Sequence, residues 1–77
     1  MGMVDAKAAF NRGLGAAGNC TEAIMDYDNI NRVQVFQFTV NVKSGGRQVV
    51  SVNVAPSEDP NEAARAAAAA FSASLEA

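Results

Sequence analysis

The residues that could carry chemistry are few, and the densest group is the acidic run from Asp26 to Asn29. A calcium-binding loop opens with a similar spacing of side-chain oxygens. Such a loop needs Gly at its sixth position and Glu at its twelfth, whereas this sequence has Asn31 and Gln37 there. We therefore interpret the run either as a solvated turn held by side-chain hydrogen bonds or as a patch that contacts a partner.

Two other patterns lack the context that their chemistry requires. Gly13-x-Gly15-x-x-Gly18 has the spacing of a dinucleotide-binding loop, but it follows a predicted helix instead of a strand. Cys20 is the single cysteine, and no basic cluster lies near it in sequence to activate the thiol. Because the chain also has no His and no paired carboxylates in a recognisable motif, we expect a protein that is not an enzyme and uses no cofactor or metal.

Composition limits the partners and the size of the core. The 77 residues suffice for a single domain, residues 1–77, whose core is small enough that self-association, including a homodimer, is an alternative. The net charge is -2, and the six basic residues are scattered, so nucleic acid is not favoured as a partner. No apolar run approaches the roughly 18 residues of a membrane span. We expect a cytoplasmic protein with no membrane partner.

Periodicity predicts an α+β fold. Apolar residues at helical spacing predict a first helix over Val4–Leu14, and weak alternation predicts a strand over Thr21–Tyr27. Two further strands form a hairpin in residues 36–54, and an alanine-rich helix continues to Leu75. The predicted architecture is a three-stranded antiparallel sheet packed against two helices, in the order α-β-β-β-α. The expected core comprises Phe10, Leu14, Ile24, Phe36, Phe38, Val40, Val50, Val52, Phe71 and Leu75.

The hairpin has a predicted register. If its apolar residues share one face, Val40 lies opposite Val50 and Phe38 opposite Val52, with Ser44–Gly46 as a three-residue loop. Val33 and Val35 have the opposite parity to the residues that follow, so a bulge or the start of the strand is expected near that point.

The final helix has a recognisable start. Asp59 as the N-cap, Pro60 at the first helical position and Glu62 at the third predict a capping box. We expect Phe71 and Leu75 to anchor this helix to the sheet.

The solvent side of the hairpin is the candidate binding surface. Its amide and hydroxyl side chains predict a flat, uncharged polar face, which is unusual unless something covers it. An exposed edge strand of the same sheet could also accept a strand from a partner. The candidate partner-binding residues, including the acidic turn, are Asp26, Tyr27, Asp28, Gln37, Thr39, Asn41, Ser51 and Asn53.

The hairpin and last helix resemble part of a double-stranded-RNA-binding domain. The resemblance is carried by Phe38-Thr39-Val40-Asn41-Val42, by Gly45-Gly46, and by Ser57 followed by Ala63-Ala64-Arg65-Ala66-Ala67. It implies the α-β-β-β-α order. That family has a lysine cluster at the start of its second helix, where this chain has Glu58-Asp59-Pro60-Asn61-Glu62. The resemblance therefore supports the fold, while the acidic residues argue against RNA binding.

Residues 40–67 are also similar to a small phage-encoded anti-CRISPR protein that acts on type I systems. The similarity consists of Val40-Asn41-Val42, a glycine turn, Val49-Val50, and Ser57-x-Asp59-Pro60 before an alanine-rich helix. It implies a non-enzymatic viral inhibitor that covers a surface of a CRISPR effector complex in the host cytoplasm. We thus expect a protein-binding module. The alternatives are a degenerate RNA-binding-like domain, used for dimerisation or for RNA, and a virion accessory protein.

Overall fold

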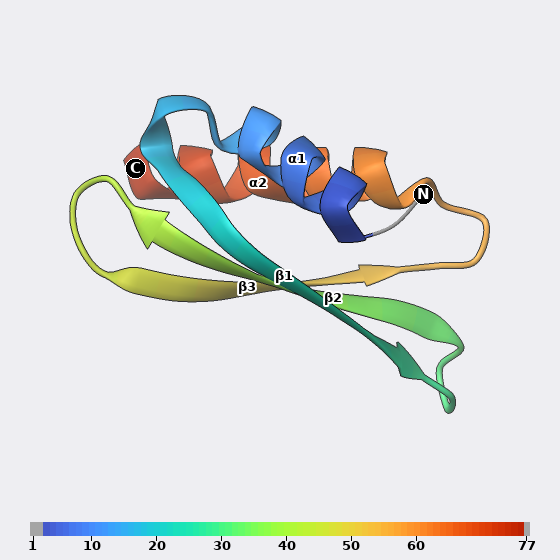
Figure 1. Cartoon of the computed structure of the whole chain (residues 1–77). Helices are drawn as coiled ribbons and strands as arrows, with labels where there is room; N and C mark the ends of the chain where they lie inside the picture. Colours follow the sequence, from blue (N-terminus) through green and yellow to red (C-terminus); the bar gives the residue numbers. More distant parts are fainter. Residues whose placement is uncertain (1–2, 77) are drawn as a thin grey trace.

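The computed structural model describes the backbone of residues 3–76 and the side chains of residues 5–75, as two helices and one antiparallel sheet (Figure 1). The elements are α1 (Met3–Leu14), a short 3-10 helix η1 (Gly15–Ala17), β1 (Gly18–Asp28), β2 (Val33–Val42), β3 (Arg47–Val54) and α2 (Pro60–Glu76). The strands lie in the order β1-β2-β3, so β2 is central. The predicted α+β class and the α-β-β-β-α order are confirmed.

Both helices cover the same face of the sheet and run side by side in the same general direction (Figure 1). Between the helices and the sheet, the rings of Phe10 and Phe38 stack with their centroids 4.2 Å apart. Phe36 extends this aromatic cluster, with its centroid 5.9 Å from that of Phe38. The buried core consists of Ala6, Ala9, Phe10, Leu14, Cys20, Phe36, Phe38, Val40, Val42, Val52, Val54, Ala64 and Ala68.

Two residues expected in the core are outside it. Ile24 is 49% exposed because it pairs with Gln37, on the face of the sheet that the helices leave open. Leu75 is 37% exposed because it lies in the last turn of α2, where it borders a shallow hollow together with Ala17 and Val42. The prediction that Leu75 anchors α2 is therefore wrong. Partly buried positions against the core are taken by Val50 and Phe71.

The first strand is longer than predicted and contains a β-bulge. Its pairing with β2 shifts between Cys20 and Glu22, which leaves Thr21 as the extra residue. Side chains alternate along a regular strand, so Cys20 and Ala23, three residues apart, could not otherwise share a face. The bulge places both of them toward the helices, where Cys20 is buried and Ala23 packs against the core.

The register of the β2–β3 hairpin differs from the prediction by two residues. Val40 lies opposite Gln48, and Phe38 lies opposite Val50. A shift of two residues keeps every side chain on its face, so Val50, Val52 and Val54 still point toward the helices. Of the two alternatives predicted near Val35, the structure shows the start of the strand: β2 begins at Val33 and has no bulge there. Val33 and Val35 lie on the open face.

The loop of this hairpin has the predicted length but begins one residue earlier. The N–H of Gly45 donates to the carbonyl of Val42 (2.9 Å), and the N–H of Val42 donates to the carbonyl of Gly46 (3.0 Å). The loop is therefore Lys43–Gly45. Gly45 and Gly46 have φ angles of 114° and 93°, which residues with a Cβ rarely adopt.

The start of α2 is capped, although without the reciprocal capping box. Asp59 Oδ1 accepts the N–H of Asn61 at 2.9 Å, as expected for an N-cap residue. Glu62 instead accepts a hydrogen bond from Arg65 Nε at 2.7 Å, so the predicted return bond from Glu62 to the cap is wrong.

Candidate functional site

The face of the sheet opposite the helices, called the open face below, carries most of the residues predicted to bind a partner. Gln37 pairs with Ser51, and Asn41 pairs with Arg47, while Phe38 and Val40, which alternate with this set, are buried under the helices. Thr39 and Asn53 belong to the same alternating set, opposite Val49 and Val35 respectively. The sheet thus brings together the predicted residues Gln37, Thr39, Asn41, Ser51 and Asn53.

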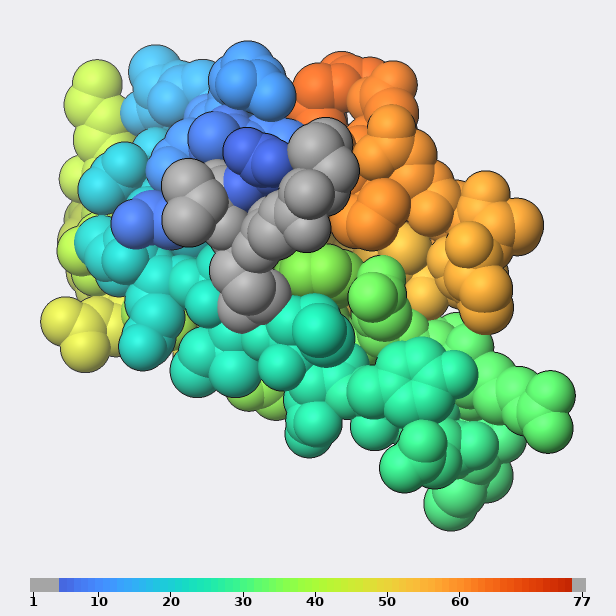
Figure 2. Space-filling view, turned by 45° about the vertical axis from the view of Figure 1, so that its right-hand side comes forward, coloured from blue at the N-terminus to red at the C-terminus, as the bar shows by residue number. Residues whose placement is uncertain are grey.

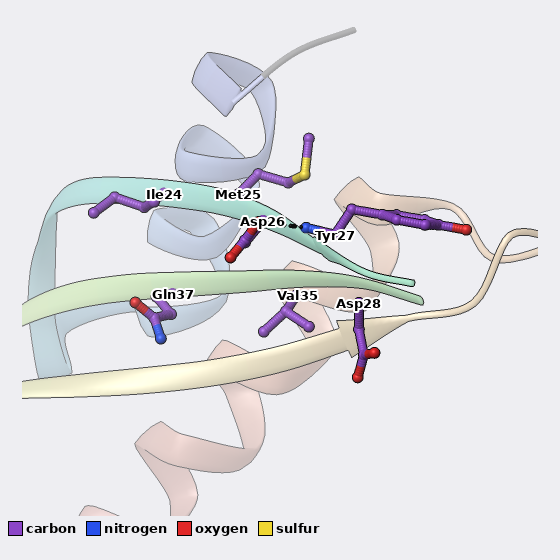
Figure 3. Close-up of a pocket in the computed structure, with 7 residues that line it drawn as sticks. All are labelled: Ile24, Met25, Asp26, Tyr27, Asp28, Val35 and Gln37. Atoms are coloured by element: carbon purple, nitrogen blue, oxygen red, sulfur yellow. Dashed lines mark hydrogen bonds between the residues drawn. The ribbon is translucent and has the colours of Figure 1, made fainter. Parts of the chain in front are cut away.

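The acidic turn is divided between two faces. Asp26 and Asp28 lie opposite Val35 and Val33, and so they share the open face. Tyr27 points the other way, pairs with Gln34 and lies on the helix side of the sheet. In Figure 3, the side chain of Tyr27 points away from those of Asp28 and Val35. A single flat partner could therefore contact the two carboxylates together, but not Tyr27 with them.

The open face is neither uncharged nor wholly polar, which corrects the prediction. Arg47 enters it beside Asn41, with Arg47 Nε 3.4 Å from Asn41 Oδ1. At the opposite edge of the same face, β1 contributes Glu22, Asp26 and Asp28. The prediction left out Arg47, which has the same parity as Ser51 and Asn53, and it treated Asp26 and Asp28 as a separate turn instead of as part of this face.

The turn between β1 and β2 is ordered by one carboxylate. Asp28 Oδ1 accepts the N–H groups of Ile30 (2.9 Å) and Asn31 (3.1 Å), and Asp28 Oδ2 accepts the side-chain amide of Asn31 (2.8 Å). The bond from the Asn31 side chain is the main cause that lowers the pKa of Asp28 below its ordinary value. The carboxylate is thus charged at neutral pH, and it forms the side-chain hydrogen bonds expected of a solvated turn.

The end of the β1–β2 hairpin extends beyond both helices. We call residues 24–35 the β1–β2 arm. An 11-residue strand such as β1 is about 36 Å long, whereas the 12-residue helix α1 is about 18 Å long, so the helices cannot cover it all. Figure 2 shows the arm, in teal and green, as a projection from the body of the molecule.

The β1–β2 arm is unusually rich in exposed apolar side chains. Ile24, Met25, Tyr27 and Ile30 are 49%, 42%, 48% and 91% exposed. Ile24, Met25 and Tyr27 border a groove of about 390 Å³, whose other lining residues are Asp26, Asp28, Val35 and Gln37 (Figure 3). Ile24 was predicted as a core residue, and Met25 and Ile30 were not among the predicted binding residues. The available signal was that Ile24 breaks the alternation of its strand.

The outer edge of β1 is covered at one end by a side chain of α1. The N–H of Cys20 donates to Asn11 Oδ1 at 2.6 Å, and Asn11 Nδ2 donates to the carbonyl of Cys20 at 3.2 Å. The carboxamide of Asn11 thus bonds to both peptide groups of Cys20, as a neighbouring strand would. The thiol of Cys20 is buried, and this burial raises its pKa, so it stays protonated at neutral pH.

Asn11→Ala is expected to lower the free energy of unfolding by about 1–3 kcal/mol, because it leaves a partly buried N–H and C=O without partners. The measurement is urea unfolding followed by circular dichroism. Asn19→Ala, which removes an exposed side-chain amide from β1 next to Cys20, is the matched control and should have little effect. Equal stability of the two variants would show that the Asn11 bonds contribute nothing.

The described residues offer neither a metal-binding cluster nor a membrane-spanning helix. Among the described side chains, no group of three or more Cys, Asp or Glu residues could hold a metal ion. The helices within residues 3–76 include none long and apolar enough to cross a membrane. Comparison of the chain with family models, curated proteins and solved structures gives no match. The surface described above is therefore the basis for a functional proposal.

Proposed function

We propose that this chain is a non-enzymatic protein-binding module, which binds its partner through the open face of the sheet and the β1–β2 arm. The observation that carries the proposal is the group of exposed apolar side chains on the arm: Ile24, Met25, Tyr27 and Ile30. Three of them, Ile24, Met25 and Tyr27, border one groove. Apolar surface gathered in this way on a small domain commonly marks a protein interface. Neighbouring amides and carboxylates supply the polar rim that such interfaces have.

The resemblance to anti-CRISPR proteins suggests one specific version of this proposal. In that version the chain is a phage inhibitor, and its partner is a bacterial CRISPR effector complex in the host cytoplasm. The open face and the arm would cover a surface of that complex.

Affinity capture from bacterial lysate tests the binding surface. Thr39→Arg with Ser51→Arg places two bulky charges on the open face, and it should remove the partner while leaving the circular dichroism spectrum unchanged. Ala66→Arg with Ala70→Arg is the matched control, because it adds the same charges to exposed positions of α2. We expect proteins that bind the wild type and the α2 variant but not the sheet variant. Retention of every bound protein by the sheet variant would contradict the proposal.

An RNA-binding-like domain is the second candidate, because the observed α-β-β-β-α order is the one that the resemblance to this family implies. The charges argue against RNA. At the start of α2, Glu58 accepts the N–H of Ala55, Asp59 caps the helix, and Glu62 pairs with Arg65. These carboxylates would repel phosphates. Binding of a 20-base-pair RNA duplex that weakens steeply with added salt would favour this candidate over the first.

A further inference from the structure

We propose that the free edge of β1, from Ala23 to Tyr27, binds an extended segment of a partner protein in which lysine or arginine alternates with apolar residues. The segment would add a fourth strand to the sheet. This inference rests on the proposed function, and it specifies the chemistry of the partner segment.

The pairing of the strands shows which peptide groups face the free edge. The N–H of Val42 donates toward β3, so by alternation Gln37 and Val35 of β2 direct their peptide groups toward β1. Ile24 lies opposite Gln37, and Asp26 lies opposite Val35. The residues between and beside them, Ala23, Met25 and Tyr27, therefore direct their N–H and C=O groups away from β2.

Among the described residues, two side chains close part of this edge. Asn11 bonds to the peptide groups of Cys20, and Asp26 Oδ1 accepts the N–H of Tyr27 at 2.8 Å. Between these two points, no described side chain or backbone group outside β1 hydrogen-bonds to Ala23 or Met25. An unpaired edge of this kind is a template for an added strand, which would supply the missing partners.

The side chains along this edge favour a partner that alternates in character. Met25 and Tyr27, each more than 40% exposed, lie on the helix side of the sheet. On the open face, the charged residues of β1 are Glu22, Asp26 and Asp28, and β1 contains no Lys or Arg. An added strand presents alternate residues to the two faces. Apolar residues on one side would contact Met25 and Tyr27, and basic residues on the other would approach the carboxylates.

A second copy of this chain fits the edge poorly. Two copies could pair antiparallel through this edge, related by a twofold axis at residue 24, 25, 26 or 27. An axis at 24 or 25 would place Glu22 of one copy opposite Asp26 or Asp28 of the other. An axis at 26 or 27 would place Asp26 opposite Asp26 or Asp28. Like charges directly opposite each other destabilise paired strands. An axis nearer the start of β1 would meet Cys20, whose peptide groups already bond to Asn11. The charge pattern thus selects a basic segment over self-pairing.

The test uses an acetylated, amidated seven-residue peptide that alternates valine and lysine, added to the full chain labelled with nitrogen-15. We expect the largest amide shift changes in residues 22–28, slower hydrogen exchange at Ala23 and Met25, and weaker binding as salt is added. The same peptide with glutamate in place of lysine should bind at least tenfold more weakly. Equal binding of the two peptides, or shifts centred on β3 or the helices, would overturn the proposal.

Two further variants separate edge pairing from general attraction. Met25→Pro removes an outward N–H that the described chain does not use, which an edge strand tolerates, and it should weaken binding at least tenfold. Val49→Pro makes the same change on the outer edge of β3 and should bind the peptide like the wild type. Asp26→Asn tests the charge while keeping an oxygen near Tyr27, and it should weaken the binding and its salt dependence. Undiminished binding to Met25→Pro would contradict edge pairing.

A modified peptide gives a test that does not depend on the folding of any variant. Methylation of the peptide nitrogens that face β1 blocks strand addition without changing charge, so it should abolish binding to the wild type. Persistent binding would refute the added strand. This inference can fail while the proposed function holds. If the Thr39→Arg, Ser51→Arg variant loses a lysate partner but the wild type binds no peptide, the chain is still a protein-binding module, and the edge of β1 is not its binding site.

Discussion

Phe38→Ala is expected to lower the free energy of unfolding by about 3–5 kcal/mol, enough to unfold much of the protein. Phe38 is fully buried on the central strand, and its ring stacks on Phe10 and lies 5.9 Å from Phe36. Most of the other buried side chains are alanines and valines, so they cannot fill the space left by a ring. Urea unfolding followed by circular dichroism measures the loss.

Tyr27→Ala is the matched control, since it removes an aromatic ring that is 48% exposed on the β1–β2 arm. It should cost less than about 1 kcal/mol. Phe38→Leu should fall between the two, because it retains much of the buried apolar volume. A similar loss of stability for Phe38→Ala and Tyr27→Ala would mean that the aromatic cluster does not hold the helices on the sheet.

The sequence was sufficient to predict the elements and the faces of the hairpin. Alternation from Phe36 to Val42 determines which side chains are buried, and it tolerates no shift by a single residue. The same alternation cannot separate registers that differ by two residues. The observed pairing of Val40 with Gln48 satisfies the pattern as well as the predicted pairing with Val50 does. The two registers differ in whether Gly45 or Gly46 is the last residue of the loop. Because both positions are glycine, the sequence does not decide between the registers.

The first strand was harder to predict because its bulge changes the parity within one element. Cys20 faces the core on one side of the bulge, and Ala23 faces it on the other. From Glu22 onward the alternation is regular, and it places Ile24 with Asp26 on the open face, as observed. The prediction of Ile24 as a core residue followed its apolar side chain instead of this parity. Nothing in Thr21 itself specifies that it should be the extra residue. The hydrogen bonds of Asn11 to Cys20, which link α1 to this part of the strand, appear only when the helix is packed.

Part of the candidate site could be predicted from the alternation of side chains in the sequence. Alternation alone places Asp26 and Asp28 on one face and Tyr27 on the other, so their grouping as a single turn patch was avoidable. The overhang of the β1–β2 arm was not evident, because it depends on how far β1 extends beyond Tyr27 and Thr21 and on where the helices lie over it. Apart from Ile24, whose parity with Asp26 was a signal, the exposed apolar residues on this overhang have no sequence feature that separates them from core residues. Strand and helix lengths decide that distinction.

The second large effect is expected at the closest approach of the two helices. The substitution considered is Gly13→Ala. Replacing a glycine inside a helix by alanine normally stabilises the helix by about 1 kcal/mol. Here a Cβ at Gly13 would overlap the carbonyl oxygen of Arg65 and lie 2.7 Å from the Cβ of Ala68. Neither atom can move by rotating a side chain, so α1 and α2 must separate. We expect a net loss of about 1–3 kcal/mol, typical of overpacking.

Thermal unfolding measures this loss, and for a domain of this size about 1 kcal/mol corresponds to roughly 4–8 °C in Tm. Gly13→Ala combined with Ala68→Gly removes one of the two overlaps, so it should recover part of the loss but leave the clash with the Arg65 carbonyl. Ala66→Gly, at an exposed position of α2, measures the helix propensity alone. If Gly13→Ala raised Tm by the amount that propensity predicts, the helices would not approach so closely. The two helices could not then cover the aromatic cluster together as described.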